Sequence, residues 1–127
     1  MFTSIAISTM ARDLATHAAA RQGLAARNVA NADTPGYRAT DLPDFATTLN
    51  GTATALRATR PGHLGAGTGP RGADPVDAGA EPSPSGNTVS LESELLRSAG
   101  IRQQHEMALG VSGTVRDILR AALGRIR

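Results

Sequence analysis

The chain has 127 residues with an aromatic content of 2%, which supports one small domain with little bulky material for a globular core. All 13 basic side chains are arginines and the formal net charge is +2, too small an excess to indicate a polyanion-binding protein by itself. Cysteine is absent, which excludes disulfides, a thiolate nucleophile and a sulfur-ligated metal site.

Residues 1–31 are predicted to form a first long helix. Apolar and small side chains recur there at steps of three and four residues, and this spacing places them on one helix face. Ile7 and Leu14 belong to that face, so we expect both to pack against another helix.

A polar, turn-forming stretch follows directly and reads Asn-Val-Ala-Asn-Ala-Asp-Thr-Pro-Gly-Tyr-Arg-Ala over residues 28–39. Either asparagine tolerates the left-handed conformation that ends many helices, and the threonine before proline favours extended backbone. The Pro-Gly pair suits the two central positions of a type II turn. The candidate site residues of this stretch are Asn28, Asn31, Thr34, Pro35, Gly36 and Tyr37.

The middle of the chain is predicted to lack long elements. Residues 32–50 are expected to form the turn and an extended or irregular segment, in which Asp41 and Asp44 are interpreted as acids that solvate a loop. Residues 51–86 are crowded with Gly, Pro, Ala and Thr, a composition typical of a flexible loop.

Residues 87–127 are predicted to form the second long helix. Its apolar side chains alternate at steps of three and four residues, which is the pattern of a seam along a partner helix. The side chains that we expect helix pairing to bury are Leu95, Ile101, Val111, Val115 and Ile118. The predicted fold class is all-α, with two long terminal helices that pair in a coiled-coil-like manner and together form one domain, joined by an irregular segment and the Gly/Pro-rich loop.

Glycines interrupt both predicted helices, at positions 23, 100, 110 and 113. Each costs about 0.5–1 kcal/mol relative to alanine inside a helix. Two interpretations remain open: the glycines allow close approach of the helices, or they keep the isolated chain marginally stable so that folding is coupled to assembly.

The sequence gives no support for catalysis, a metal site or a cofactor. His17, His63 and His105 lie in different segments, and none stands beside a second candidate ligand. A nucleic-acid-binding protein is the alternative from another class, because several arginines lie on the second helix. Acids are interspersed among them and no aromatic platform for bases accompanies them, so we expect no nucleic-acid partner and no small-molecule substrate.

Three separated motifs resemble those of the bacterial flagellar basal-body rod proteins. The stretch from Asn28 to Tyr37 resembles a signature shared by several of these proteins, and its continuation from Tyr37 to Phe45 resembles the proximal rod subunits of the FlgB type. Arg60-Pro61-Gly62-His63-Leu64 also fits that type, as does the segment from Gly86 to Glu94. The alternative within the same class is another short rod subunit of this family.

The resemblance implies a structural subunit that assembles helically around the export channel and transmits torque from the membrane ring towards the hook. The partners it implies are other copies of the chain, neighbouring rod proteins, the rod-base adapter, the membrane ring and the export gate. It also implies a location in the periplasmic rod of the basal body. Because no secretory signal is apparent, export without a cleaved signal peptide is expected.

Overall fold

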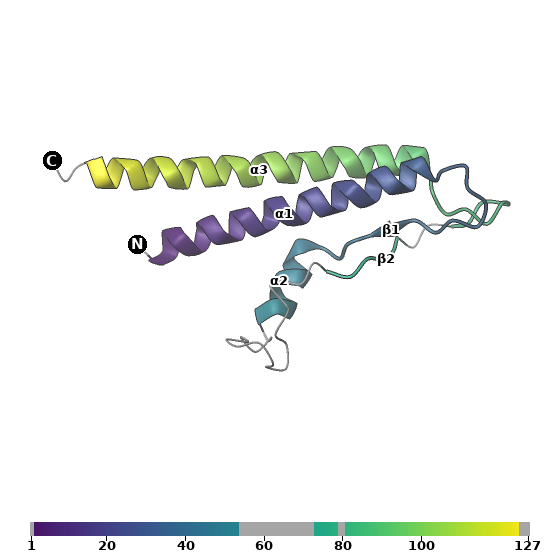
Figure 1. Cartoon of the computed structure of the whole chain (residues 1–127), viewed down its shortest axis with the longest axis horizontal. Helices are drawn as coiled ribbons and strands as arrows, with labels where there is room; N and C mark the ends of the chain where they lie inside the picture. The colour runs from purple at the N-terminus through teal and green to yellow at the C-terminus, as the bar shows by residue number, and fades with distance from the viewer. Residues whose placement is uncertain (1, 54–72, 79–80, 125–127) are drawn as a thin grey trace, which may run out of the picture.

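The computed structural model of the chain describes residues 2–53, 73–78 and 81–124. Its body is a pair of long helices, α1 (Phe2–Ala30) and α3 (Leu91–Gly124). They lie side by side and antiparallel, so the beginning of α1 and the end of α3 lie at the same end of the molecule (Figure 1). The predicted all-α class, with two long terminal helices that pack together and an irregular segment between them, is confirmed.

The seam between the two helices is narrow and consists mainly of small residues. On α1, Ala11, Ala18 and Ala25 are buried at intervals of seven residues. The buried positions of α3 follow the same interval and are Glu94, Ile101, Ala108 and Val115. Spacing of seven residues is that of a coiled coil, in which one stripe of each helix stays against its partner. Alanine at each of the three α1 positions keeps that stripe narrow.

This seam buries only part of the set that the sequence pattern assigns to helix packing. Ile101 and Val115 are buried, and Leu14 is half-buried. Leu95 and Ile118 are 69% and 58% exposed, so the expectation that pairing of the long helices buries them is wrong for the single chain. The same correction applies to Ile7 and Val111, which are exposed. The physical reason is that α1 covers only one stripe of α3, and the side chains on either flank of that stripe face outwards.

The chain between the long helices folds back along α1. It forms strand β1 (Thr40–Asp41), which pairs antiparallel with β2 (Val76–Asp77), and between them helix α2 (Phe45–Ala53) (Figure 1). Thr40 is opposite Asp77 and Asp41 is opposite Val76 in this pair.

Helix α2 departs from the sequence expectation, which has an extended or irregular segment up to residue 50. The extended part ends at Asp44, whose carbonyl accepts a hydrogen bond from the Thr48 N–H at 3.0 Å. Of the predicted loop 51–86, residues 54–72 and 79–80 lie outside the described residues, as does the Arg60-to-Leu64 motif.

The helix glycines do not serve close packing within the chain. A Cβ atom added at Gly23, Gly100, Gly110 or Gly113 would meet no atom of the described residues within 4 Å. The interpretation that these glycines let α1 and α3 approach each other is therefore wrong for the single chain. No helix among the described residues is both long and apolar enough to cross a membrane.

Candidate functional site: a polar joint between two motifs

Two motifs that lie far apart in the sequence meet at the end of the helix pair where α1 ends and α3 begins. Gly36 and Gly86 both adopt left-handed backbone, with φ of 71° and 78°. The Gly36 N–H donates to the Ser85 carbonyl at 3.1 Å, and the Thr88 N–H donates to the Tyr37 carbonyl at 3.0 Å. A Cβ on Gly86 would lie 3.5 Å from the Gly36 Cα, so the two turns pack backbone against backbone.

Asn87 bonds carbonyl groups of the turns that follow α1. Its buried side-chain amide donates through Nδ2 to the carbonyls of Asn31, Ala32 and Thr34, at 2.9, 2.7 and 2.8 Å. Its Oδ1 accepts from the Val89 N–H at 2.7 Å. Helix ends require such acceptors and donors to be satisfied, and here the partner comes from the segment that leads into α3.

The Asn28 side chain on α1 is fully buried and bonds the backbone of β1. Its Nδ2 donates to the Thr40 carbonyl at 2.9 Å, and its Oδ1 accepts from the Thr40 N–H at 3.1 Å. The side-chain amide thus pairs with β1 as a neighbouring strand would. The Tyr37 hydroxyl donates to the same Oδ1 at 3.3 Å, and Thr88 Oγ1 accepts from the Ala39 N–H at 2.8 Å.

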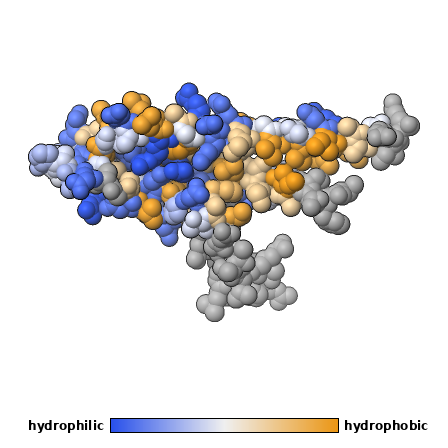
Figure 2. All heavy atoms as spheres, turned by 180° about the vertical axis from the view of Figure 1, so that it is seen from behind, coloured by the Kyte–Doolittle hydropathy of each residue, from blue (hydrophilic) through white to orange (hydrophobic). Residues whose placement is uncertain are grey.

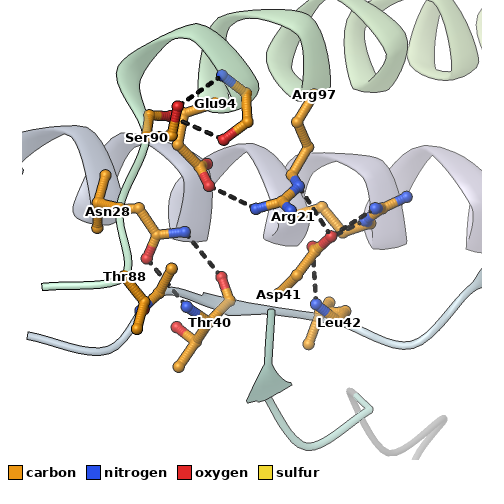
Figure 3. A network of polar contacts seen from close by, with 12 residues as sticks. Arg21, Asn28, Thr40, Asp41, Leu42, Thr88, Ser90, Glu94 and Arg97 are labelled. Carbon is orange, nitrogen blue, oxygen red and sulfur yellow. Dashed lines mark hydrogen bonds and ion pairs between the residues drawn. The ribbon is translucent and has the colours of Figure 1, made fainter. Parts of the chain in front are cut away.

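A chain of four charges connects α1, β1 and α3 beside these amides (Figure 3). Arg21 binds Asp41 with both ends of its guanidinium, Nε to Oδ1 at 2.9 Å and Nη2 to Oδ2 at 2.6 Å. Arg97 Nε lies 3.5 Å from Asp41 Oδ2, and its Nη1 contacts Glu94 Oε1 at 2.5 Å. We call the following six side chains the polar joint: Arg21, Asn28, Asp41, Asn87, Glu94 and Arg97.

The electrostatics of the joint favour the ionised form of its central carboxylate. Burial by itself would raise the pKa of Asp41, but the hydrogen bond from Arg21, the Leu42 N–H and the charges of Arg21 and Arg97 outweigh it, so the pKa of Asp41 is lowered. The hydrogen bond to Asp41 raises the pKa of Arg21 in return. Both groups therefore stay charged near neutral pH.

His17 extends the same line of contacts along α1. Its Nε2 lies 3.0 Å from the Pro43 carbonyl, and its ring meets Phe45 edge-on with centroids 5.6 Å apart. Asn28, Arg21 and His17 of α1 therefore hold Thr40, Asp41 and Pro43 in turn, which places the segment after the motif turn along the helix.

All six predicted site residues lie in this region, but their side chains differ in solvent exposure. Asn28 is buried, Asn31 and Tyr37 are half-buried, and the Thr-Pro-Gly turn between them is exposed. Neither asparagine adopts the left-handed conformation that both residues tolerate. Instead, the Asn31 N–H still bonds the Arg27 carbonyl at 3.2 Å, and the chain leaves α1 through consecutive turns.

Sequence reasoning missed the charged part of the joint. Asp41 was expected to solvate a loop, and no partner was assigned to Arg21, Glu94 or Arg97. One signal was available: Glu94 lies seven residues before Ile101, so the interval of the apolar seam extends to a carboxylate. A charge at a seam position indicates a buried ion pair.

The geometry of the joint is that of a connector, since Arg21, Asp41 and Arg97 tie α1, β1 and α3 together, and Asn28 and Asn87 bond segments distant in the chain. Among the described residues, no group of three or more His, Asp or Glu side chains is arranged to hold a metal ion. A long helix pair with exposed apolar flanks and a polar connector at one end is the architecture of a structural protein that packs against other helices.

Comparison with known proteins specifies the family within this class. The chain is 34% identical over 113 residues to the flagellar basal body rod protein FlgB of Escherichia coli strain K12, covering 80% of this chain and 81% of the relative. The FlgB protein of Shigella flexneri matches with the same identity and coverage. No family model matches the chain. At this identity and coverage, the chain belongs to the flagellar basal body rod protein FlgB family, whose members are structural subunits of the flagellar rod.

Proposed function

We propose that this chain is a subunit of the proximal rod, which assembles helically around the export channel and transmits torque towards the hook. Family membership supports the rod assignment. The proposal also includes export through the flagellar apparatus without a cleaved signal peptide, and contacts with the rod-base adapter, membrane ring and export gate.

The observation that carries the proposal is the apolar surface that the helix pair leaves uncovered. Seen from behind, apolar residues gather along the part of the pair where α1 begins and α3 ends, whereas hydrophilic residues dominate the joint end (Figure 2). On α3, large apolar side chains are exposed on both flanks of the seam: Leu91, Leu95, Leu96, Met107, Leu109, Val111, Ile118 and Leu123. Contiguous exposed apolar surface marks contact sites, and neighbouring subunits of a helical assembly would cover it.

Within this proposal the motif residues have two different roles. The exposed turn of Thr34, Pro35 and Gly36 is positioned to contact an adjacent subunit. Asn28 and Tyr37 point inwards and hold that turn on the helix pair. We further propose that the segments 1–31 and 87–127 form one axial domain, from which 32–50 and the Gly/Pro-rich loop 51–86 branch.

The nucleic-acid alternative receives no support from the joint. Arg21 and Arg97 are engaged by Asp41 and Glu94 and are not presented to solvent as a phosphate-binding patch. Arg102, Arg116 and Arg120 of α3 are exposed, so it is membership of the FlgB rod protein family that favours the rod function over this alternative.

Mass spectrometry of purified hook-basal bodies from the source bacterium tests the proposal. The particles should be cross-linked with a carboxyl-directed reagent, because the chain contains no lysine for amine-directed reagents. We expect peptides of this chain in the particle, linked to other copies and to other rod proteins. Complete absence of the chain from well-formed particles would overturn the proposal.

A further inference from the structure

The apolar seam repeats itself at the interval of one heptad. Its α1 side presents Ala11, Ala18 and Ala25, and its α3 side continues from Ile101 through Ala108 to Val115 at the same seven-residue interval. Sliding α3 by seven residues, about 10 Å along the axis, would place Ala18 opposite Ala108 in place of Ile101. Apolar side chains would still face alanines, so the seam discriminates poorly between registers.

The polar joint has no such repeat. Glu94 occupies a buried seam position and contacts Arg97, which in turn reaches Asp41 on β1. Asn87 bonds three specific carbonyls at the end of α1, only four residues before α3 begins. A slip of one heptad would separate Arg97 from Asp41 and Asn87 from its three carbonyls, although the Glu94–Arg97 pair within α3 would move as a unit. The buried Asn87 amide would then lose its partners, and Asp41 would lose one of its two arginines, which is costly.

We propose that the polar joint, and not the apolar seam, specifies the register of α1 against α3. Asn87, Glu94 and Arg97 are then positioning residues: they determine which exposed apolar side chains of the two helices lie next to one another. This inference concerns the isolated chain and does not rest on its assembly in the rod.

Disulfide trapping tests the register directly, because the natural chain has no cysteine. Gln22 Nε2 and Ser98 Oγ are 2.7 Å apart, so the pair Gln22→Cys with Ser98→Cys reports the native register. Gln22→Cys with His105→Cys, and Gln22→Cys with Leu91→Cys, report slips of one heptad in either direction. Oxidation rates of the three pairs are compared in the intact chain and in a chain whose joint carries Asp41→Leu, Asn87→Ala, Glu94→Leu and Arg97→Met.

With the joint intact, we expect the native pair to form at least about tenfold faster than either slipped pair, which corresponds to a preference of about 1.4 kcal/mol. In the joint variant, we expect the slipped pairs to form at a rate comparable to that of the native pair. A joint variant that stays helical by circular dichroism and still forms only the native disulfide would overturn the proposal.

A second variant decides the question if the joint variant loses its helices. Ile101→Ala removes the largest side chain of the buried core cluster and leaves the joint intact. We expect this variant to keep the native disulfide preference despite its lower stability. Slipped disulfides in Ile101→Ala would show that the seam specifies the register, contrary to the proposal.

Discussion

Asp41 joins three elements through one carboxylate. Arg21 reaches it from α1 and Arg97 from α3, while its own backbone belongs to β1. Its pKa is lowered because these partners outweigh the effect of burial. Because the pKa of Asp41 is lower in the folded chain than in the unfolded chain, its ionised carboxylate stabilises the fold.

Replacing Asp41 with asparagine is expected to lower the free energy of unfolding by about 1–3 kcal/mol at neutral pH, because two arginines lose a charged acceptor. A carboxyl group with a lowered folded pKa contributes stability above its unfolded pKa of about 4 and loses it as the pH falls through the folded pKa. Thermal melts at decreasing pH should therefore show the difference between wild type and Asp41→Asn shrinking below about pH 4. Asp33→Asn, at an exposed position, is the control and should change stability by less than about 0.5 kcal/mol. A difference that stays constant into the acid range would contradict this role of Asp41.

A substitution at Gly36 tests the backbone conformation of the motif turn. The space around it is open, but its φ of 71° lies in the left-handed region. Gly36→Ala is therefore expected to destabilise the chain by about 1–2 kcal/mol through backbone strain alone. The matched control, Gly23→Ala on α1, also meets open space but has no positive φ, and should stabilise by about 0.5–1 kcal/mol. Urea titrations of both variants measure the two changes in the free energy of unfolding, which should have opposite signs. Equal changes in the same direction would refute the strain argument.

At the scale of elements, α3 is a long helix whose interior contains three glycines, which lower its intrinsic helix stability. Gly100, Gly110 and Gly113 lie within it, and in the part of the chain that the structure describes none makes room for a neighbouring atom. Their contribution inside the chain is thus a loss of helix stability. The remaining interpretation of the glycines is that folding is coupled to assembly. In that case the helices become fully ordered only when neighbouring subunits cover their flanks.

Replacing all three glycines with alanine should stabilise α3 by about 1.5–3 kcal/mol if the individual effects add. Circular dichroism of the dilute chain should then show higher helix content and a higher melting temperature than wild type. A wild-type chain that already melts cooperatively and is fully helical when dilute would contradict the marginal-stability interpretation. Loss of stability in the variant would instead show that a Cβ clashes at one of these positions.

Most elements could be predicted from the sequence because their signals are local. Small and apolar side chains at steps of three and four residues predicted both long helices, and Pro35-Gly36 predicted the turn after α1. The polar joint could not be predicted in the same way. Its partners come from segments as far apart as Arg21 and Arg97, and no local pattern states which arginine meets which carboxylate.

At the scale of the whole molecule, the helix pair leaves many large apolar side chains exposed. Ile118 lies with Met107 and Val111 on a stripe that flanks the seam, and all three are exposed. A chain that acts alone would bury such a stripe, so its exposure agrees with a subunit that is completed by neighbours.

Ile118→Gln is expected to leave the helix content and melting temperature of the dilute chain nearly unchanged, since the side chain is exposed. It should nevertheless reduce incorporation into basal bodies and swimming in soft agar, because subunit contacts lose an apolar side chain. Arg116→Gln, an exposed polar position on the same helix, is the matched control and should swim normally. Unimpaired motility in Ile118→Gln would argue against this stripe as a subunit contact.

The sequence by itself determined the two long helices, the turn between them and the family, because periodicity, turn residues and motif identity are properties of neighbouring positions. Only the tertiary structure decided which side chains the seam buries and how the motif turn is held. Burial depends on the partner's shape, and the alanines of α1 cover a single stripe of α3. The contacts that hold the turn depend on the three-dimensional meeting of Asn28, Asn87 and the four joined charges, which are distant in the chain and adjacent only once it has folded.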